Sequence, residues 1–130
     1  MNIGDTCEVK DVVSEKNTAA SLGSGALPVL GTPFLIAMME NAAFSYMQEH
    51  LPDGKSSVGV KIDMEHVSPT PIGMEVRVVA EVTHISENGK MVDFSVRGYD
   101  GAGLIGEGMH RRAVVDATRF LEKCRAKLDK

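Results

Sequence analysis

The sequence predicts an α+β fold in which a curved antiparallel sheet wraps around one long central helix, with a further helix at the C-terminus. Residues 33–50 have the pattern of a helix that is apolar on most sides, with only a narrow polar stripe. Such a helix belongs in the middle of a structure. Four segments with strand character follow it, separated by turn sequences, which is typical of an antiparallel meander. Because the helix needs cover on several sides, the sheet is expected to wrap around it.

The N-terminal part of the chain is predicted to contain a strand, a loop and the start of this helix. Residues 5–13 read as the first strand, and residues 17–31, rich in glycine and other small side chains, as a mobile loop or lid. Thr32 offers a hydroxyl as helix N-cap, and Pro33 is the preferred first helical residue. The helix should run to about His50, where a proline and a glycine soon follow.

The rest of the chain is predicted to form four strands and a helix. The strands are expected at residues 57–67, 74–85, 91–100 and 103–115. The final helix, residues 116–128, takes Asp116 as its N-cap. Its expected inward side chains are Phe120, Leu121, Cys124 and Leu128. A meander around a buried helix is the arrangement of the hotdog fold. Because such a sheet leaves exposed edges and one flank of the helix uncovered, a homodimer is expected.

Composition and charge limit the possible functions. The chain has 130 residues, of which 43% are hydrophobic and 25% charged, as expected for one globular domain over residues 1–130. A net charge of −4 argues against nucleic acid as a partner, because phosphate binding normally needs a basic surface. Cys7 and Cys124 lack the spacing of a metal site, and we expect no metal and no cofactor. The chain shows neither a signal-peptide pattern nor a long apolar run, so a cytoplasmic protein without a membrane span is expected.

His66 is the first candidate for a catalytic role. In the predicted strand that contains it, apolar residues alternate with charged ones, and His66 is in phase with the apolar set. That set is Val58, Val60, Ile62 and Met64. The imidazole is therefore expected to face the helix, although a histidine in this phase is often only structural. His110 is the alternative, but its phase fits a rim or a partner contact better.

Glu40 interrupts an apolar column on the helix. Its helical neighbours are Ile36, Ala37, Phe44 and Met47. Burial among them would make the carboxylate a stronger base, which suits general-base catalysis. The alternative is a glutamate that reaches solvent at the edge of the polar stripe. Thr32 lies eight residues earlier, about 12 Å along the axis, so the two side chains cannot touch through a straight helix. A hydroxyl at a helix N-terminus nevertheless stands where backbone N–H groups hold an oxyanion.

The joint spacing of these residues resembles a known family. Thr32 is followed by a proline, Glu40 comes eight residues later, and His66 twenty-six residues after the glutamate, with Gly59 between two valines. This pattern resembles the hotdog thioesterases of the fluoroacetyl-CoA thioesterase-like family. The resemblance covers most of the chain, from the first strand to about Asp116. It implies acyl-CoA thioester hydrolysis with Thr32, Glu40 and His66 as the catalytic set and Gly59 in the acyl pocket.

The resemblance also implies roles and a substrate class. In that family the glutamate activates water or attacks the carbonyl itself, the histidine handles protons, and the threonine positions and polarises the set. The fluoroacetyl-CoA specialists carry phenylalanines on the lid, whereas residues 22–30 here contain none, so a broader or different acyl-CoA is the expected substrate. Arg111, which belongs to the resembling His110-Arg111 pair, could contact the phosphates of coenzyme A, as could Arg112 and Arg119. A solvated basic patch is the alternative.

Other functions fit the sequence less well. Hotdog hydratases are usually recognised by an aspartate five residues before a histidine, and none of the four histidines has one. The glycine pattern at residues 101–106 matches a dinucleotide-binding motif, but a strand follows it instead of a helix, which favours a hairpin. A noncatalytic hotdog dimer that binds acyl-CoA as a sensor or carrier stays open as the alternative. Glu40 argues against it, because a binding tunnel gains little from a carboxylate.

Overall fold

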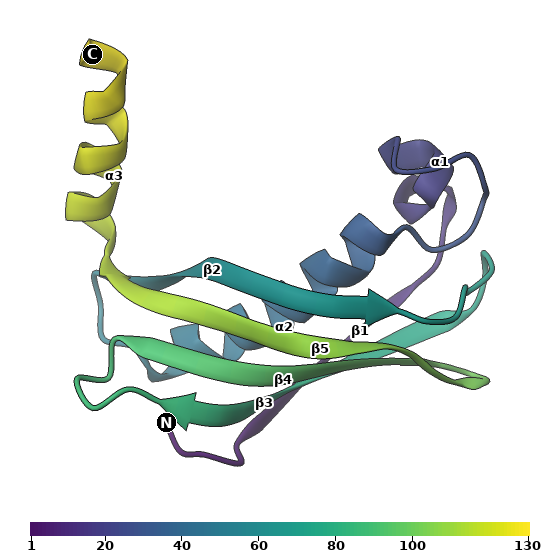
Figure 1. The fold of residues 1–130 in the computed structure, drawn as a ribbon, viewed down its shortest axis with the longest axis horizontal. Coiled ribbons are helices and arrows are strands. Elements are labelled where there is room, and N and C mark those ends of the chain that lie inside the picture. Colours follow the sequence, from purple (N-terminus) through teal and green to yellow (C-terminus); the bar gives the residue numbers. More distant parts are fainter.

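An antiparallel sheet with one long helix across its face makes up the body of the protein in the computed structural model, which describes residues 1–130 (Figure 1). The strands are β1 (Thr6–Val12), β2 (Lys55–His66), β3 (Glu75–Ile85), β4 (Met91–Asp100) and β5 (Gly103–Asp116). The helices are α1 (Ala19–Leu22), α2 (Thr32–His50) and α3 (Ala117–Arg125), with short 3-10 segments η1 (Glu15–Asn17) and η2 (Ala126–Asp129). The predicted α+β arrangement is confirmed, and every predicted strand is present.

The order of the strands decides which edges of the sheet are free. The order is β1-β3-β4-β5-β2, with every neighbouring pair antiparallel. The chain leaves β1, forms α2 across the face of the sheet, and returns as β2 at the opposite edge, where β2 pairs only with β5. Helix α2 contacts all five strands. The sheet therefore covers one side of the helix, and β1 and β2 are its two edges.

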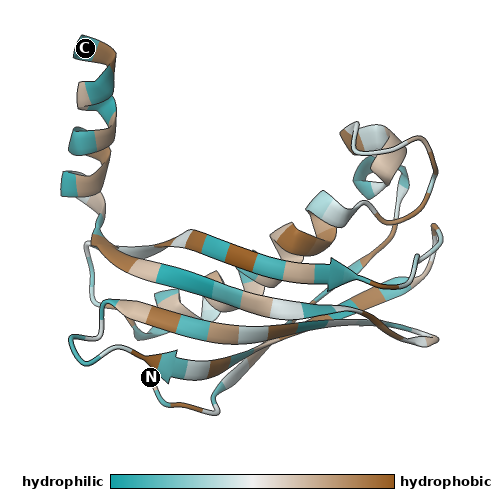
Figure 2. Ribbon diagram, in the orientation of Figure 1, coloured by the Kyte–Doolittle hydropathy of each residue, from teal (hydrophilic) through white to brown (hydrophobic).

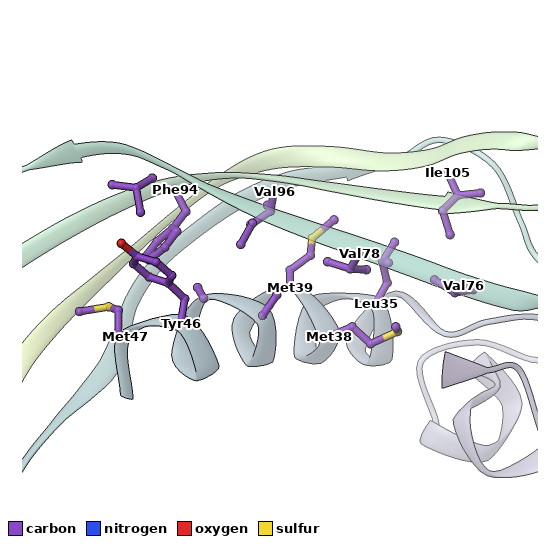
Figure 3. Packing of buried hydrophobic residues seen from close by; sticks show 14 of the residues in the cluster. Leu35, Met38, Met39, Tyr46, Met47, Val76, Val78, Phe94, Val96 and Ile105 are labelled. Atoms are coloured by element: carbon purple, nitrogen blue, oxygen red, sulfur yellow. The ribbon is translucent and has the colours of Figure 1, made fainter. Parts of the chain in front are cut away.

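The core lies between α2 and the central strands (Figure 3). Leu35, Met39 and Met47 of α2 are fully buried and point toward the sheet. They meet apolar side chains of β3, β4 and β5, among them Val78, Phe94, Val96 and Ile105. The opposite flank of the helix, with Ala37, Asn41 and Phe44, is exposed in the single chain. This is the uncovered flank that the sequence predicts. None of the helices is both long enough and apolar enough to cross a membrane.

A β-bulge at Val60 divides β2 into two halves. Gly59 lies opposite Arg112 and Lys61 opposite Arg111, so Val60 has no partner of its own on β5. Before the bulge the odd-numbered residues face α2, and after it the even-numbered residues do. The predicted orientation of His66 is therefore right. The prediction that Val58 and Val60 share its face is wrong, because the extra residue reverses the alternation; Val60 is 49% exposed.

The segment predicted as a mobile loop or lid contains short helical elements. It forms η1 and α1, and Asn17 and Thr18 are buried. The backbone N–H of Gly31 donates to the carbonyl of Asn17 at 2.9 Å, and that of Leu30 donates to the carbonyl of Thr70 at 2.9 Å. These bonds hold the segment against the start of α2 and the turn that follows β2.

Helix α3 begins as predicted but packs differently. The side chain of Asp116 accepts from the backbone N–H of Arg119 at 3.0 Å and so caps the helix. The side chains expected to face inward are exposed instead, with Phe120 at 41% and Leu121 at 48%. These side chains are exposed because of the direction of the helix. Strand β5 ends at the edge of the molecule, and α3 projects away from the core beyond β2 (Figure 1). Figure 2 shows the hydrophobic residues of α3 alternating with hydrophilic ones on this uncovered helix.

Replacing Phe94 with alanine should lower the free energy of unfolding by about 3–5 kcal/mol, because the fully buried ring would leave a cavity between α2 and the sheet. Leu128→Ala, at a residue that is 87% exposed, is the control and should change the free energy by less than about 0.5 kcal/mol. Urea unfolding at matched protein concentration measures both. Equal effects of the two substitutions would contradict the packing in Figure 3.

Candidate active site

Thr32 and His66 form a direct pair at one end of the sheet. Thr32 begins α2 and His66 ends β2, and Thr32 Oγ1 lies 2.7 Å from His66 Nδ1. The predicted role of Thr32 as N-cap is wrong, since Gly31 is the N-cap and no side chain caps this helix. The Thr32 hydroxyl is hydrogen-bonded to the imidazole, and this bond orients the ring.

The His66 ring has one nitrogen without a protein partner. The side chain is half-buried, and its Nε2 atom is buried without a protein hydrogen-bond partner. Burial lowers the pKa of His66 below its usual value, which favours the neutral ring at pH 7. The pair lines a pocket of about 300 Å³, whose other walls are mostly apolar or small. They are Ala19, Ser24, Val29, Leu30, Val67, Ser68 and Pro69.

Glu40 lies in a second cluster, away from the Thr32–His66 pair. Its side chain is 43% exposed in the single chain, so the apolar column does not enclose it, and of the two alternatives the structure shows the glutamate that reaches solvent. The carboxylate turns toward Arg112 instead, with Oε2 3.7 Å from a guanidinium nitrogen. A Cβ atom on Gly59 would lie 2.7 Å from this oxygen, so the glycine leaves room for the carboxylate. Gly59 therefore lies beside Glu40.

Arg112 is held in place from three directions. Its Nε donates to Ser57 Oγ at 2.9 Å, one terminal nitrogen donates to the Ser57 carbonyl at 3.1 Å, and the other lies 3.1 Å from His110 Nε2. Only 7% of the Arg112 side chain is exposed. Burial lowers the pKa of Arg112, and Glu40 opposes this shift. A buried guanidinium with most of its donors engaged has few alternative positions, so it presents a fixed positive charge to Glu40.

His110 completes this network from within the core. The ring is 2% exposed, so its predicted place at a rim is wrong. Its Nδ1 lies 2.8 Å from the Lys61 carbonyl, which can only accept, and its Nε2 faces the Arg112 guanidinium, which can only donate. These partners require a neutral ring with the proton on Nδ1. Burial, first of all, lowers the pKa of His110 and favours the same neutral form.

The sequence indicates His110 only as the alternative to His66 and Arg112 only as a contact for the coenzyme A phosphates, and it indicates no role for Ser57. A signal was available for two of them, because His110 and Arg112 alternate with two glycines on β5 and so share its helix-facing side. Ser57 carried no such signal, because the bulge that turns it toward the helix is not encoded in simple alternation.

Arg111 occupies the opposite face of the sheet. It makes a two-pronged ion pair with Asp93, with nitrogen–oxygen distances of 2.7 and 3.2 Å. This pair lines a separate shallow pocket of about 200 Å³ on the outer surface. The structure therefore does not bring Arg111 together with the other predicted site residues. No group of three histidine, cysteine or acidic side chains converges as a metal site would require.

The site residues thus form two groups within one chain. Thr32 and His66 lie at one end of α2, and Glu40 lies eight residues further along, about 12 Å away by the helical rise. Gly59 and Arg112 accompany Glu40. No hydrogen bond or ion pair joins the two groups.

The model of one family matches most of the chain. Residues 13–118 match the family described as fluoroacetyl-CoA-specific thioesterase. This chain belongs to that family. The fluoroacetyl-CoA thioesterase of Streptantibioticus cattleyicolor is 35% identical to it over 99 residues, which cover 76% of this chain and 70% of that protein. The sequence-based assignment to hotdog thioesterases, which hydrolyse acyl-CoA thioesters, is thereby confirmed.

Solved structures show the same fold. The fluoroacetyl-CoA thioesterase FlK superposes with a TM-score of 0.91 at 31% sequence identity, over 98% of this chain and 97% of that one. A thioesterase superfamily member from Thermus thermophilus superposes with a TM-score of 0.89 at 25% identity, over 98% of this chain and 93% of that one. FlK variants have been crystallised with acetyl-CoA and with fluoroacetate and CoA. The hotdog fold of this family member is therefore shown.

The stability of the protein should fall in acid, partly through His110. Because the pKa of His110 is lowered from 6.5 by burial, the unfolded chain binds a proton on this ring at a pH where the folded chain does not. The stabilisation that the neutral His110 ring provides is complete above about pH 6.5. It is lost as the pH falls through the lower pKa that the ring has in the folded state. Protonation would also turn Nε2 into a donor that faces the Arg112 guanidinium.

Urea unfolding of wild type and His110→Gln over the range from about pH 8 to about pH 5 measures this effect. The glutamine amide oxygen can still accept from Arg112, and it does not titrate. The variant should lose stability less steeply in acid, while His66, whose lowered pKa acts in the same direction, contributes to both curves. Parallel curves would contradict the role assigned to His110.

Proposed function

We propose that this protein hydrolyses an acyl-CoA thioester other than fluoroacetyl-CoA, at a site made by two subunits. Thr32 and His66 come from one subunit, and Glu40 comes from its partner. One observation carries the proposal: the Thr32–His66 pair has an unoccupied ring nitrogen in a pocket, while the carboxylate that hydrolysis needs lies about 12 Å away on the same helix.

A twofold axis can unite the two groups. Strand β2 has a free edge, and a second copy that adds its own β2 antiparallel to this edge continues the sheet. Directly opposite residues of antiparallel strands must face the same side. With the bulge at Val60 in both strands, several residues after the bulge meet this condition when they lie on the axis. We place Asp63 there because Lys61 then falls opposite Glu65 of the partner subunit. In that register, Gly59 of the partner subunit lies opposite His66.

The same register brings the carboxylate to the imidazole. Because Glu40 lies against Gly59 within its own chain, the partner subunit's Glu40 comes to the Thr32–His66 pair. On the outer face, Lys61 falls opposite Glu65 of the partner subunit, and these two opposite-charge pairs flank the two Asp63 carboxylates that meet on the axis and repel each other. The exposed flank of α2, with Ala37 and Phe44, then faces the same flank of the partner's helix.

The chemistry assigns one task to each group. If the Thr32 hydroxyl donates to His66 Nδ1, Nε2 carries the ring proton and points into the pocket as a donor for the thioester carbonyl oxygen. The Glu40 carboxylate takes a proton from water as the water oxygen bonds to the carbonyl carbon. The C–S bond then breaks, and the departing thiolate takes up the proton that Glu40 received from water, which restores the carboxylate. Thiolate is a good leaving group, so little acid assistance is needed.

Attack by Glu40 itself is the second route to the same products. The carboxylate would form an anhydride with the acyl group and release the thiol, and water would then hydrolyse the anhydride. A single turnover in ¹⁸O-labelled water tests the anhydride route. Label in the Glu40 carboxylate arises only when water opens an anhydride at its glutamyl carbonyl, and it therefore supports this route. Label in the product acid alone is expected for activated water and also for water that attacks the acyl carbon of the anhydride.

The proposed substrate follows from the lid. Residues 22–30 contain leucines and small residues but no phenylalanine, and the pocket beside Thr32 is lined by Val29, Leu30 and Val67. Such walls suit an aliphatic acyl group. A noncatalytic dimer that binds acyl-CoA is the alternative function, and Glu40 beside an engaged Arg112 is the feature against it.

Glu40→Gln and His66→Ala should each lower kcat/KM by about 10²–10⁴, because each removes a group that transfers or donates a proton in the reaction. Release of free thiol from a panel of acyl-CoAs of increasing chain length measures the effect. Lys10→Glu, at an exposed residue of β1, is the control and should retain wild-type activity. Tight acyl-CoA binding without thiol release at any chain length would favour the noncatalytic alternative.

Mixed dimers test the shared site directly. One chain carries both Thr32→Ala and His66→Ala, and the other carries Glu40→Gln. Each homodimer should be inactive, whereas random mixing makes half of the dimers mixed, each with one intact site of two. Roughly a quarter of wild-type activity should therefore return after the chains are refolded together. No recovery, or a stable monomer by light scattering, would contradict the shared site.

A further inference from the structure

A groove lies far from Thr32 and His66, where β5 passes into α3. It measures about 530 Å³, and four cationic side chains line it. They are Lys55, Lys90, Arg119 and Lys123. All four are exposed, and none of the ion pairs in the structure involves them. Because the chain as a whole carries a net charge of −4, such a concentration of unpaired positive charge needs an explanation.

The acidic residues of the groove neutralise only part of this charge. Asp116 and Glu122 also line it. The Asp116 carboxylate is engaged at the N-terminus of α3, where it accepts from the backbone N–H of Arg119 at 3.0 Å. Four cations against two carboxylates leave the groove positive. Val114, Val115 and Phe120 add an apolar wall. A groove with cations beside apolar surface suits a ligand with phosphate groups and an organic body.

The pocket at Thr32 lacks what the far end of the proposed substrate needs. Coenzyme A carries a diphosphate and a 3′-phosphate, but no lysine or arginine lines the pocket beside Thr32 and His66. These phosphates therefore need cations from elsewhere. The pantetheine arm between sulfur and diphosphate is as long as four to five residues of extended chain, roughly 15 Å.

Within one chain this arm is too short to reach the groove. Lys55 and His66 are the two ends of β2, separated by eleven residue steps, roughly 36 Å along the strand. Between two subunits, the distance from the pocket of one chain to the groove of the other is much shorter. In the antiparallel β2 pairing proposed above, the beginning of the partner's β2 lies beside the end of this one. The partner's groove then lies next to the turn that follows His66, within reach of the arm.

We propose that the groove lined by Lys55, Lys90, Arg119 and Lys123 binds the phosphate groups of coenzyme A while the thioester occupies the Thr32–His66 pocket of the other subunit. This inference rests on the proposed function and on its dimer. It assigns Arg119, not Arg111, to the phosphates, because Arg111 is already paired with Asp93 on the outer face of the sheet.

Equilibrium binding tests the groove without relying on hydrolysis. The double variant Arg119→Glu/Lys123→Glu should bind coenzyme A at least about tenfold more weakly than wild type, because two charge-assisted contacts are replaced by repulsion. Its affinity for dephospho-CoA should fall less, and its affinity for pantetheine should stay unchanged. Lys127→Glu, a charge reversal in η2 outside the groove, is the matched control. Unchanged affinity of the double variant for coenzyme A, or an equal loss in the control, would overturn the phosphate site.

Mixed dimers then show which subunit supplies the groove. In the pair described above, the active site combines Thr32 and His66 of the Glu40→Gln chain with Glu40 and the groove of the other chain. The double reversal should raise KM for the acyl-CoA when it is placed on the chain that supplies Glu40. It should have no effect when it is placed on the Glu40→Gln chain. The opposite dependence would overturn the proposal. Absence of hydrolysis in wild type would refute the proposed function, and loss of coenzyme A binding in the double variant would still support the phosphate site.

Discussion

A helix that is apolar on nearly every side is the constraint on which the rest of the structure depends. Exposed apolar surface is costly, so α2 must be covered along its length, and a curved sheet of five strands covers one side of it. The other flank stays open in the single chain, and Glu40 sits at the border between the two. The polar groups proposed to act on the substrate therefore lie where the cover of the helix ends, because there a carboxylate can belong to a largely buried helix and still be accessible.

One extra residue in β2 reconciles two demands on that strand. Ser57 and Gly59 must face α2 to hold Arg112 and make room for Glu40, and His66 must face the same side to meet Thr32. Strict alternation cannot satisfy both, because 59 and 66 differ by an odd number. The extra residue at the Val60 bulge reverses the alternation, so that Gly59 and His66 both face α2. The buried polar network beyond it, from Lys61 through His110 to Arg112, is satisfied at every ring nitrogen, which makes it a rigid support for the carboxylate.

The proposed division of the site between two subunits would allow hydrolysis with few polar groups. If a carboxylate, an imidazole and a hydroxyl were all buried in one short stretch of core, each would need its own hydrogen-bonding partners in the same place. Here Glu40 is supported by Arg112, and His66 by Thr32, at two separate positions along α2. A twofold axis through the free edge of β2 would bring the supported halves together only in the assembled protein. The same axis would carry the positive groove of one subunit to the pocket of the other, although each chain keeps them at opposite ends of β2.

Patterns of short range determined the elements of this protein. The apolar periodicity of residues 33–50 predicted α2, turn chemistry predicted the hairpins, and the phase of His66 predicted its direction correctly. Everything that depended on contacts between distant segments was decided by the tertiary structure alone. The hydroxyl of Thr32 bonds to His66 instead of capping its own helix, Glu40 turns to Arg112 instead of being enclosed, and α3 leaves the core instead of packing on it. The physical reason is that periodicity reports which side of an element avoids water, whereas the partner of a polar side chain is set by whichever segment the fold brings within hydrogen-bonding distance.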